Sequence, residues 1–577
     1  MPKTNEELEE LFNEWADLIR ISGGDPFRAR SYEKAAAALG AYPKDVASLD
    51  EKALQAIPTI GKSMAARIRE YVDKASLHEL EDLRELVPPG VRELTRIPGL
   101  GPKKAVLLNQ ELGVSNIDEL VVAIGEHKLR GIKGLGPKTE ENIARNIEQF
   151  QQHGDRVQLN VALSLAEELV AGLAECTAVQ EVTYCGSLRR MRETIGDVDI
   201  LAASNDVEAV MNAFDELPMV GRTIARGDTK MSVITLKGVQ VDLRVVPHDA
   251  WGAALIYFTG SKAHNIKIRE MAVKRGWKLS EYGLFTTKTD KRMAAKTEEA
   301  VYAKLGLPWI PPTLREDAGE VEAALAGNLP TLIELDDIKG DLHTHTNLTD
   351  GQATIEDMLA TAAARGYTYY AVTDHAEHLY MTGMSREKVL AQRAKIADLQ
   401  KKFPKMTILH GTELNIDQHG QVDYDADFLS GFDITVASVH SYFNLSRDGM
   451  TKRIITAMEN PNVHIIGHPT GRKINSRLPY EFDAEAVFAA AARTGTAMEV
   501  NSYPDRLDLR DEHVRWAIGA GATISIDTDS HAVGHLAGIR YGVATAQRGW
   551  AQKANVLNAK PLKQLEAFVA RKRAKAR

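Results

Sequence analysis

The C-terminal half of the chain repeats one pattern, in which an apolar, β-rich run ends in polar residues that include histidine or a carboxylate. The repeats are DLHTH at 341–345, TDHAEH at 373–378, HGTELNI at 410–416, ASVHSYF at 437–443, IIGHPTG at 465–471 and SIDTDSH at 525–531. Helical patterns such as IEDMLATAAARG and AEAVFAAAARTG alternate with these runs. Alternating strands and helices predict a β/α barrel, in which the side chains at the strand ends gather on one face.

The residue types at these strand ends indicate a metal site. Twelve of the seventeen histidines lie from 336 onward, whereas Cys176 and Cys185 are the two cysteines of the chain. A disulfide framework and a thiolate zinc site are therefore excluded, and any metal must be bound by histidine and carboxylate. A single histidine at a strand end is more often a structural residue. Their recurrence at successive strand ends favours metal binding.

The length of 577 residues is too great for a single core and predicts roughly three to five domains. No run of apolar residues is long enough to span a bilayer. The first residues, MPKTNEELEELFNEW, are acidic and amphipathic and lack the basic and apolar regions of a signal peptide. We therefore expect a cytoplasmic protein that does not interact with membranes.

Three similar segments repeat in the first 150 residues: IPTIGKSMAARI at 57–68, IPGLGPKKAVLL at 97–108 and IKGLGPKTEENI at 132–143. Each predicts a tight turn before a helix, where backbone N–H groups can meet a phosphate. A single Gly-x-Gly before a helix is often only a cap and turn, but three copies favour a function. The first copy has Thr59 in place of a glycine. The candidate DNA-binding residues of the other two are Gly99, Gly101, Lys103, Gly134, Gly136 and Lys138.

These segments resemble helix-hairpin-helix elements, which bind the DNA backbone without reading its sequence. The net charge of the whole chain is −8, so a strongly basic surface is not what would attract DNA. Contacts to phosphate would instead depend on the local geometry of the turns.

Carboxylates are concentrated again between 181 and 247. Asp197 and Asp199 are two residues apart in a strand-like run, so both face the same side, and Asp242 lies in a second such run, VQVDLRVV. Three neighbouring carboxylates are costly unless cations neutralise them, and a pair of divalent ions is the usual arrangement for phosphoryl transfer. Gly186 and Ser187, followed by Arg189 and Arg190, are candidates for binding a triphosphate. The alternative is that the Asp-x-Asp pair is a turn and Asp242 a solvated strand residue.

The segments GSLRRMRETIGDVDIL and YFTGSKAHNIKIR resemble the nucleotidyltransferase and thumb motifs of family X DNA polymerases. The resemblance implies gap-filling, template-directed synthesis from deoxynucleoside triphosphates on gapped or primer–template DNA. It implies that Asp197, Asp199 and Asp242 bind two Mg²⁺ ions, with Asp242 as the proton acceptor. The implied ligands of the nucleotide and DNA are Gly186, Ser187 and Arg190 for the triphosphate, Tyr257 and Phe258 around the sugar, Gly260 beside them, and Asn265 and Arg269 at the minor-groove side of the new base pair.

Residues up to about 85 resemble the small domain of the same family, in which some relatives carry a deoxyribose-phosphate lyase lysine. Arg67 stands at that position and Ser63 at a nearby helical position. Arginine stays protonated and cannot act as an amine nucleophile. Lyase activity is therefore not expected at Arg67, although Lys62 or Lys34 could replace it.

The C-terminal motifs DLHTH, TDH, a central His, and DSH resemble the PHP family of metal-dependent phosphoesterases. The resemblance implies up to three ions, either Zn²⁺ or Mn²⁺. One would be bound by His343, His345, Glu413 and Asp529, a second by Glu413, His440 and His468, and the third by Asp350, His375 and His531. Arg472 or Arg506 could stabilise the charge that develops during hydrolysis.

Taken together, the chain resembles bacterial family X polymerases that carry a PHP domain, which implies a 3′→5′ exonuclease, or an abasic-site endonuclease or 3′-phosphatase, acting in base excision repair. Two alternatives remain: a degenerate, purely structural PHP part, and a phosphatase of small phosphomonoesters with a DNA-binding adaptor. The predicted fold is multidomain α and α/β. Its parts are a helical lyase-like domain (1–85), a fingers-like helical domain (86–154), a nucleotidyltransferase palm (155–247), a thumb (248–315), a linker (316–335) and a distorted β/α barrel (336–577).

Overall fold

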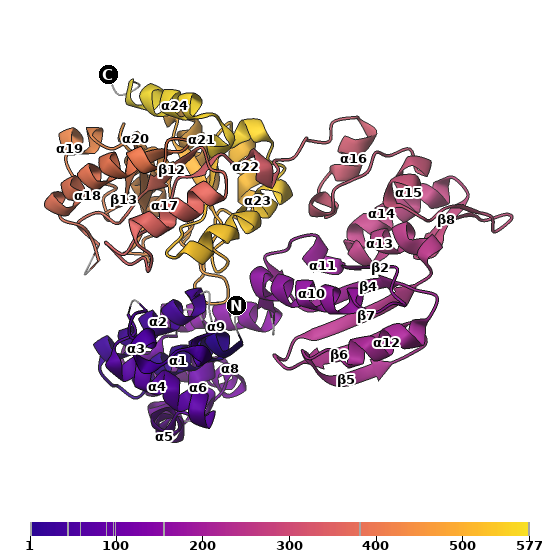
Figure 1. Ribbon diagram of the computed structural model, residues 1–577, viewed down its shortest axis with the longest axis horizontal. Coiled ribbons are helices and arrows are strands. Elements are labelled where there is room, and N and C mark those ends of the chain that lie inside the picture. The colour runs from indigo at the N-terminus through magenta and orange to yellow at the C-terminus, as the bar shows by residue number, and fades with distance from the viewer. Residues whose placement is uncertain are drawn as a thin grey trace.

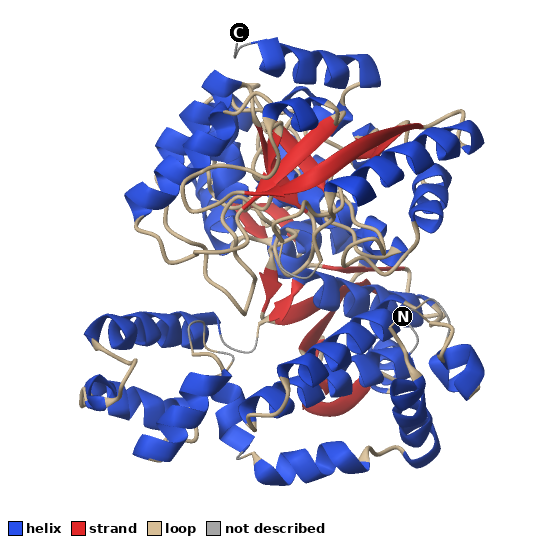
Figure 2. Ribbon diagram, turned by 90° about the vertical axis from the view of Figure 1, so that its left-hand side faces the viewer, coloured by secondary structure: helices blue, strands red, loops and turns tan. Residues whose placement is uncertain are grey.

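A computed structural model describes residues 3–42, 45–57, 59–87, 89–95, 97, 100–153, 156–379 and 382–574 of the chain. Helices make up the N-terminal part, mixed sheets the middle and a parallel barrel the C-terminal part (Figures 1 and 2). The predicted fold class is confirmed by these elements. Among the described residues, no helix has the length and apolarity that crossing a membrane requires.

The N-terminal part is entirely helical. Its α-helices are α1 (Lys3–Ile21), α2 (Pro26–Ala41), α3 (Glu51–Leu54), α4 (Lys62–Lys74), α5 (His78–Leu86), α6 (Pro89–Leu94), α7 (Pro102–Leu112), α8 (Ile117–Gly125) and α9 (Pro137–His153). One continuous set of buried apolar side chains extends from Leu8 to Ile147. Both predicted helical domains therefore contribute to one core, and the boundary between them at 85 stays a prediction.

The middle part contains a five-stranded sheet with the order β2-β4-β7-β6-β5. Its strands are β2 (Glu181–Tyr184), β4 (Asp197–Ala203), β5 (Val220–Arg226), β6 (Lys230–Thr235) and β7 (Gln240–Val246). The central pair, β4 and β7, is parallel, and Asp199 is the register partner of Asp242. Helices α10 (Leu159–Ala174) and α12 (Val207–Asp215) pack against the sheet and against each other.

A smaller unit follows the five-stranded sheet. It consists of α13 (Trp251–Thr259), α14 (Lys262–Lys274), the sheet β8 (Trp277–Ser280), β9 (Gly283–Thr286) and β10 (Arg292–Ala294), and α15 (Glu298–Lys304). The segment predicted as a linker, 316–335, is not a free tether. Its helix α16 (Glu320–Leu325) places Val321 and Ala324 in the core of this unit, and Glu320 is fully buried. Apolar residues between the acidic ones make this packing possible.

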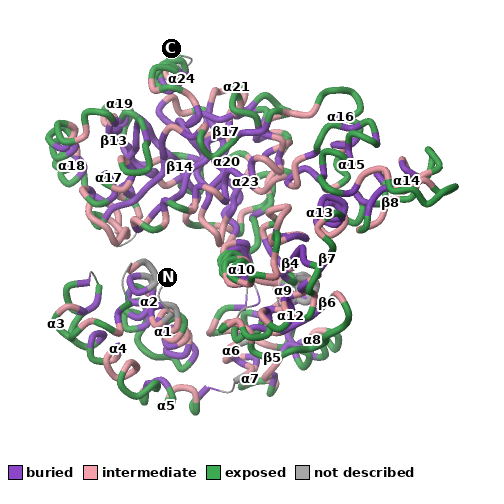
Figure 3. The backbone as a smooth tube through the Cα atoms, turned by 45° about the vertical axis from the view of Figure 1, so that its right-hand side comes forward, coloured by how far each residue is buried: buried purple, intermediate pink, exposed green. Residues whose placement is uncertain are grey.

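The C-terminal part is a nearly closed barrel of seven parallel strands in chain order. The strands are β11 (Gly340–Asp341), β12 (Tyr369–Val372), β13 (Thr407–Asn415), β14 (Ile434–Ser438), β15 (Ile465–Ile466), β16 (Ala497–Asn501) and β17 (Ile524–Asp527). The helices are α17 (Ile355–Ala364), α18 (Arg386–Leu399), α19 (Ala426–Ser430), α20 (Arg447–Glu459), α21 (Ala484–Thr494), α22 (Asp511–Gly519), α23 (Ile539–Arg548) and α24 (Leu562–Ala574). Strands β13, β14 and β17 are buried almost throughout, as Figure 3 shows.

Local sequence explains the alternation of strands and helices. Five of the helices begin directly after a residue whose short polar side chain accepts a hydrogen bond from the first turn, which stabilises the helix start. These capping residues are Thr354, Ser385, Asp425, Ser446 and Asp483.

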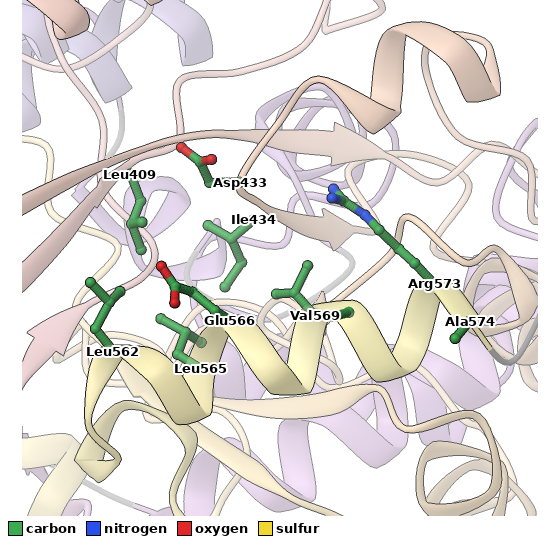
Figure 4. A pocket seen from close by; sticks show the side chains of 10 residues that line it. Leu409, Asp433, Ile434, Leu562, Leu565, Glu566, Val569, Arg573 and Ala574 are labelled. Atoms are coloured by element: carbon green, nitrogen blue, oxygen red, sulfur yellow. The ribbon is translucent and has the colours of Figure 1, made fainter.

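The last helix, α24, covers the N-terminal ends of the barrel strands. Leu565 and Val569 of the helix face Leu409 and Ile434 of the strands across a cavity of about 500 Å³ (Figure 4). The strand-end histidines lie at the opposite end of the barrel.

Asn558 connects the first and last strands of the barrel. Its buried side-chain amide donates to the carbonyls of Gly340 and Ile526, and its Oδ1 accepts from the N–H of Ile526 at 3.1 Å. A second connection is the bond from the N–H of Leu342 to Asp527 Oδ1, at 2.9 Å. Because β11 and β17 form no continuous ladder, these side chains supply much of the closure.

We expect Asn558→Ala to weaken the barrel at this junction by roughly 2–3 kcal/mol, because it leaves buried backbone groups without partners. Hydrogen exchange followed by mass spectrometry measures this directly as faster exchange in β11 and β17. Asn555→Ala, which removes only a local cap near Gln552, serves as the control. Unchanged protection of both strands in Asn558→Ala would contradict this role.

Candidate active sites

The first candidate site is the trio of carboxylates on β4 and β7. Asp197, Asp199 and Asp242 each offer an oxygen within 4.8 Å of the others. The parallel register of the two strands causes this approach, because it sets Asp199 directly beside Asp242. The turn before β4 also packs closely, since a Cβ on Gly186 would lie 2.0 Å from Asp199 Oδ2.

The electrostatics of the trio suit divalent cations. Burial raises the pKa of Asp199 to about 7, and repulsion from Asp197 and Asp242 adds to this effect. Burial also acts on Asp242, but hydrogen bonds from Lys230, Ser232 and Gln240 outweigh it and lower the pKa of that carboxyl. Three carboxylates with one nearby lysine, whose Nζ is 2.6 Å from Asp242 Oδ2, carry negative charge that bound cations would balance.

A cavity of about 690 Å³ opens beside the trio. Most of the predicted nucleotide-binding residues line it: Gly186, Ser187, Arg190, Tyr257, Phe258, Gly260 and Asn265. Arg269 is not in the lining, and its guanidinium lies 5.2 Å from the centre of the Tyr257 ring. Asn265 is buried and donates to the carbonyl of Tyr257 at 2.7 Å, whereas its Oδ1 has no partner. The structure therefore brings the two predicted motifs together around one cavity.

Several lining residues were not predicted. Arg156, Arg192, Lys262 and Glu316 join the wall of the same cavity. Arg192 and Lys262 lie within the two quoted motif segments, whereas Arg156 and Glu316 lie outside them, where no motif points to them. Lys230, the partner of Asp242, reaches it because β6 pairs antiparallel with β7, and that pairing cannot be read from sequence.

In each of the three segments a helix begins directly after a glycine. In the first two copies Gly61 and Gly101 are the caps before α4 and α7, and in the third α9 begins directly after Gly136. In the first and third copies the preceding glycine position is left-handed: Gly134 has a φ of 93°, and Thr59 has a φ of 71°. Lys103 is exposed. Gly99 lies outside the described residues, as does the side chain of Lys138.

Arg67, which stands where some relatives carry a lyase lysine, packs against aromatic rings and a carboxylate. Its guanidinium lies 5.2 Å from the Trp15 ring and 5.7 Å from the Tyr32 ring, and it pairs with Glu79 at 2.5 Å. Arg67 is therefore a packed, ion-paired residue. Lys34 and Lys62 are exposed, and their role as a substitute nucleophile stays a prediction.

The second candidate site lies at the C-terminal ends of the barrel strands. Three groups of side chains are close enough to share an ion: His343, His345 and Asp529; His375, Glu413 and His440; and His345, Asp350, His375 and His531. Glu413 is central, because its Oε1 lies 3.1 Å from Nε2 of His468 and 3.4 Å from Nε2 of His343. All nine predicted ligands are thus brought together. The grouping differs from the prediction: His345 joins the third group, His375 takes the place of His468 beside Glu413 and His440, and Glu413 is absent from the first group.

Buried ring nitrogens indicate that this cluster fits metal ions. His343 Nε2 and both ring nitrogens of His345 are buried without hydrogen-bond partners, although carboxylates stand a few ångströms away. Burial lowers the pKa of His375, but Glu413 and Asp350 outweigh it and raise the pKa to about 10. Burial also opposes ionisation of Glu413, yet the neighbouring histidines hold the pKa of that carboxyl well below its usual range. A donor set of imidazoles and carboxylates suits Zn²⁺ or Mn²⁺.

Supporting residues of this cluster were missed by the sequence interpretation. Glu499, fully buried in the middle of β16, accepts from Nδ1 of His343 at 2.6 Å and also from the N–H of His468. Asn415 contacts Nδ1 of His440 at 2.8 Å. Glu499 lies within the β-rich run TAMEVN at 496–501, so the pattern that identified the other strands could have found it.

The two arginines proposed to stabilise charge differ in position. Arg506 is near the cluster, with Nε 3.5 Å from Asp529 Oδ2 and a buried Nη1 that has no partner. Arg472 instead donates to the carbonyls of Arg506 and Leu507 and pairs with Glu193, in the middle part of the chain, at 2.7 Å. Arg472 is therefore a contact between the barrel and the middle part, and the structure favours Arg506.

Thr59→Gly is expected to stabilise the N-terminal helical part by about 1 kcal/mol, because glycine adopts the left-handed conformation without strain. Chemical denaturation of the intact chain measures the free energy of unfolding, and hydrogen exchange in α4 measures the local stability. Thr59→Ala keeps the Cβ in the same backbone conformation and should give no gain. A loss of stability in Thr59→Gly would show that the hydrogen bond from Thr59 Oγ1 to the Lys34 carbonyl, 3.1 Å long, matters more than the strain.

Comparisons with known proteins cover all parts of the chain. Family models match residues 3–77 (helix-hairpin-helix domain), 91–148 (SAM-like helix-hairpin-helix tandem), 254–316 (DNA polymerase beta thumb) and 341–473 (PHP domain). The "DNA polymerase/3'-5' exonuclease PolX" of Bacillus subtilis (strain 168) is 39% identical over 559 residues, 96% of this chain and 97% of that protein.

Two further relatives match separate halves. DNA polymerase lambda of Rattus norvegicus is 28% identical over 322 residues, 51% of this chain and 53% of that protein. A "Probable phosphatase" of Shewanella sp. (strain ANA-3) is 30% identical over 232 residues, 38% of this chain and 88% of that protein. The chain therefore belongs to the bacterial PolX family, the family X DNA polymerases that carry a C-terminal PHP domain.

Proposed function

We propose that this protein is a template-directed, gap-filling DNA polymerase whose barrel degrades DNA from the 3′ end. The observation that carries the proposal is the carboxylate trio beside a cavity lined by Ser187 and Arg190. The name of the Bacillus subtilis relative, a DNA polymerase and 3'-5' exonuclease similar over nearly its full length, supports both activities. A role in base excision repair in the cytoplasm is part of the same proposal.

In the polymerase site, Asp197, Asp199 and Asp242 would hold two Mg²⁺ ions. Bound there, the ions would supply Lewis-acid activation of a primer 3′-hydroxyl and neutralise the charge of the leaving pyrophosphate. Ser187 and Arg190 would bind the phosphates, and Tyr257 and Phe258 would flank the sugar. Asp242 would accept the proton of the hydroxyl. Lys230, 2.6 Å from its Oδ2, favours the ionised form that can do so.

The turns at Gly101, Gly134 and Gly136 would bind the DNA backbone and hold the DNA at this site. Their N–H groups precede helices and can contact phosphates without reading bases. Asn265 and Arg269 would contact the minor-groove side of the new base pair. The substrate would be gapped or primer–template DNA together with a deoxynucleoside triphosphate.

In the barrel, the nine predicted ligands would hold up to three Zn²⁺ or Mn²⁺ ions. Those ions would supply a hydroxide near neutral pH and bind the phosphate oxygens. Arg506 would stabilise the charge that develops on the phosphate, because its side chain is buried beside Asp529. Glu499 and Asn415 would orient His343 and His440 through their second ring nitrogens.

A second candidate function for the barrel is hydrolysis of a small phosphomonoester, which the match to the Shewanella "Probable phosphatase" favours. The two substrates are easily compared with the intact protein. Faster turnover of a small phosphomonoester than of a primer 3′ end would support this second candidate.

Asp199→Ala should reduce nucleotide incorporation at least a hundred-fold, roughly the effect of removing one essential electrostatic partner from a reacting centre. Primer extension on a one-nucleotide gap measures it. Asp228→Ala, at an exposed position between β5 and β6, should extend like the unmodified protein. If Asp199→Ala keeps more than about a tenth of the rate, the proposed roles of the trio are wrong.

His343→Ala combined with His345→Ala should abolish degradation from the 3′ end and leave gap filling near the unmodified rate, because the two sites share no ligand. Metal ligands often stabilise their domain, so thermal unfolding of the double variant must be measured alongside. Intact folding with both activities lost would contradict the independence of the two ligand sets.

A further inference from the structure

Arg548, at the end of α23 in the barrel, reaches into the polymerase part. Its side chain is 5% exposed. One nitrogen, Nη1, donates to the backbone carbonyl of Arg190 at 2.8 Å and to Glu316 Oε1 at 2.9 Å. Nε and Nη2 donate to Asp511 Oδ2 at 2.9 and 2.6 Å. A barrel residue thus contacts the main chain of the predicted phosphate-binding turn.

Glu316 forms the other half of this connection. It lines the cavity beside the carboxylate trio, and its Oε1 accepts from Arg190 Nε at 3.0 Å. Nη1 of Arg190 donates to the carbonyl of Thr259 at 2.6 Å. Two edges of the Arg190 guanidinium are therefore held by protein acceptors, and Nη2 is the nitrogen that a phosphate oxygen would reach.

Charge balance explains why Arg548 is needed. Burial opposes ionisation of Glu316, but the arginines Arg548 and Arg190 lower the pKa of that carboxyl. Asp511 balances Arg548 from the barrel side. Without Arg548, Glu316 loses one of its two closest cations, and the partly buried Asp511 loses its partner, which favours rearrangement of both carboxylates. The orientation of Arg190 depends on where Glu316 stands.

We propose that Arg548 is a positioning residue for nucleotide insertion, which holds Glu316 and the Arg190 carbonyl so that Arg190 faces the triphosphate. The proposal rests on the polymerase function proposed above. It assigns a residue of the exonuclease barrel to the nucleotide site of the polymerase, and it explains why the two parts are held together at this point.

The test is steady-state filling of a one-nucleotide gap by the full chain. We expect Arg548→Ala to raise KM for the deoxynucleoside triphosphate roughly ten- to hundred-fold, as a displaced binding group does, with a much smaller change in kcat. Arg548→Lys keeps the charge but cannot make all four contacts. Its KM should therefore lie between those of the unmodified protein and the Arg548→Ala variant. Degradation of a 3′ end should not change in either variant.

Arg540→Ala is the matched control. Arg540 lies on the same helix and also pairs with the polymerase part, through Glu167 at 2.9 Å, but neither Glu167 nor Tyr541, its hydrogen-bond partners, lines the cavity. Its KM should stay unchanged. An equal KM in the Arg548→Ala and Arg540→Ala variants would overturn the proposal, and so would a lower KM in Arg548→Ala, because Glu316 would then be a competitor of the triphosphate.

Thermal unfolding shows whether Arg548→Ala still folds. If it does not, Glu316→Gln replaces it, since this change keeps the size of the side chain and leaves the Arg548–Asp511 pair intact. A several-fold rise in KM is expected for Glu316→Gln, and an unchanged KM would overturn the proposal. Failure of the unmodified protein to fill the gap would instead contradict the polymerase function itself.

Discussion

The gathering of carboxylates and imidazoles on neighbouring strands is the constraint on which the rest of this structure depends. At the palm, the parallel register of β4 and β7 sets Asp199 beside Asp242, and burial together with repulsion between the carboxylates raises the pKa of Asp199 to about 7. In the barrel, Glu413 is buried among histidines, and several of their ring nitrogens lack hydrogen-bond partners. Both arrangements gather side chains that can bind a cation, and both hold them on a sheet.

The residues that could be predicted from sequence are those whose signal is local. Asp197 and Asp199 share a strand face because of the two-residue period, and the strand-end histidines share a barrel face because parallel strands end at one edge. Lys230, Glu316 and Arg548 carry no such signal, because β-sheet pairing or contacts between domains bring them to the site. The segment 316–335 was predicted as a linker for a related reason: the packing of Val321 and Ala324 in a core depends on contacts with distant residues.

The two sites have separate ligands on a shared scaffold. Ile474, Leu507 and Tyr541 of the barrel belong to the same buried cluster as the palm sheet, and Arg472 pairs with Glu193 across the same boundary. The barrel therefore forms part of the support of the polymerase site. Such a contact explains how a residue like Arg548 can influence nucleotide binding without touching any metal ligand.

The central claim is that each acidic cluster is a cation site. Anomalous diffraction from crystals of the full chain grown with Mn²⁺, gapped DNA and a non-reactive triphosphate analogue tests it most directly. The account predicts anomalous peaks between Asp197, Asp199 and Asp242 and, separately, among the histidines around Glu413. Peaks at neither cluster, with the DNA and the analogue bound in place, would contradict it.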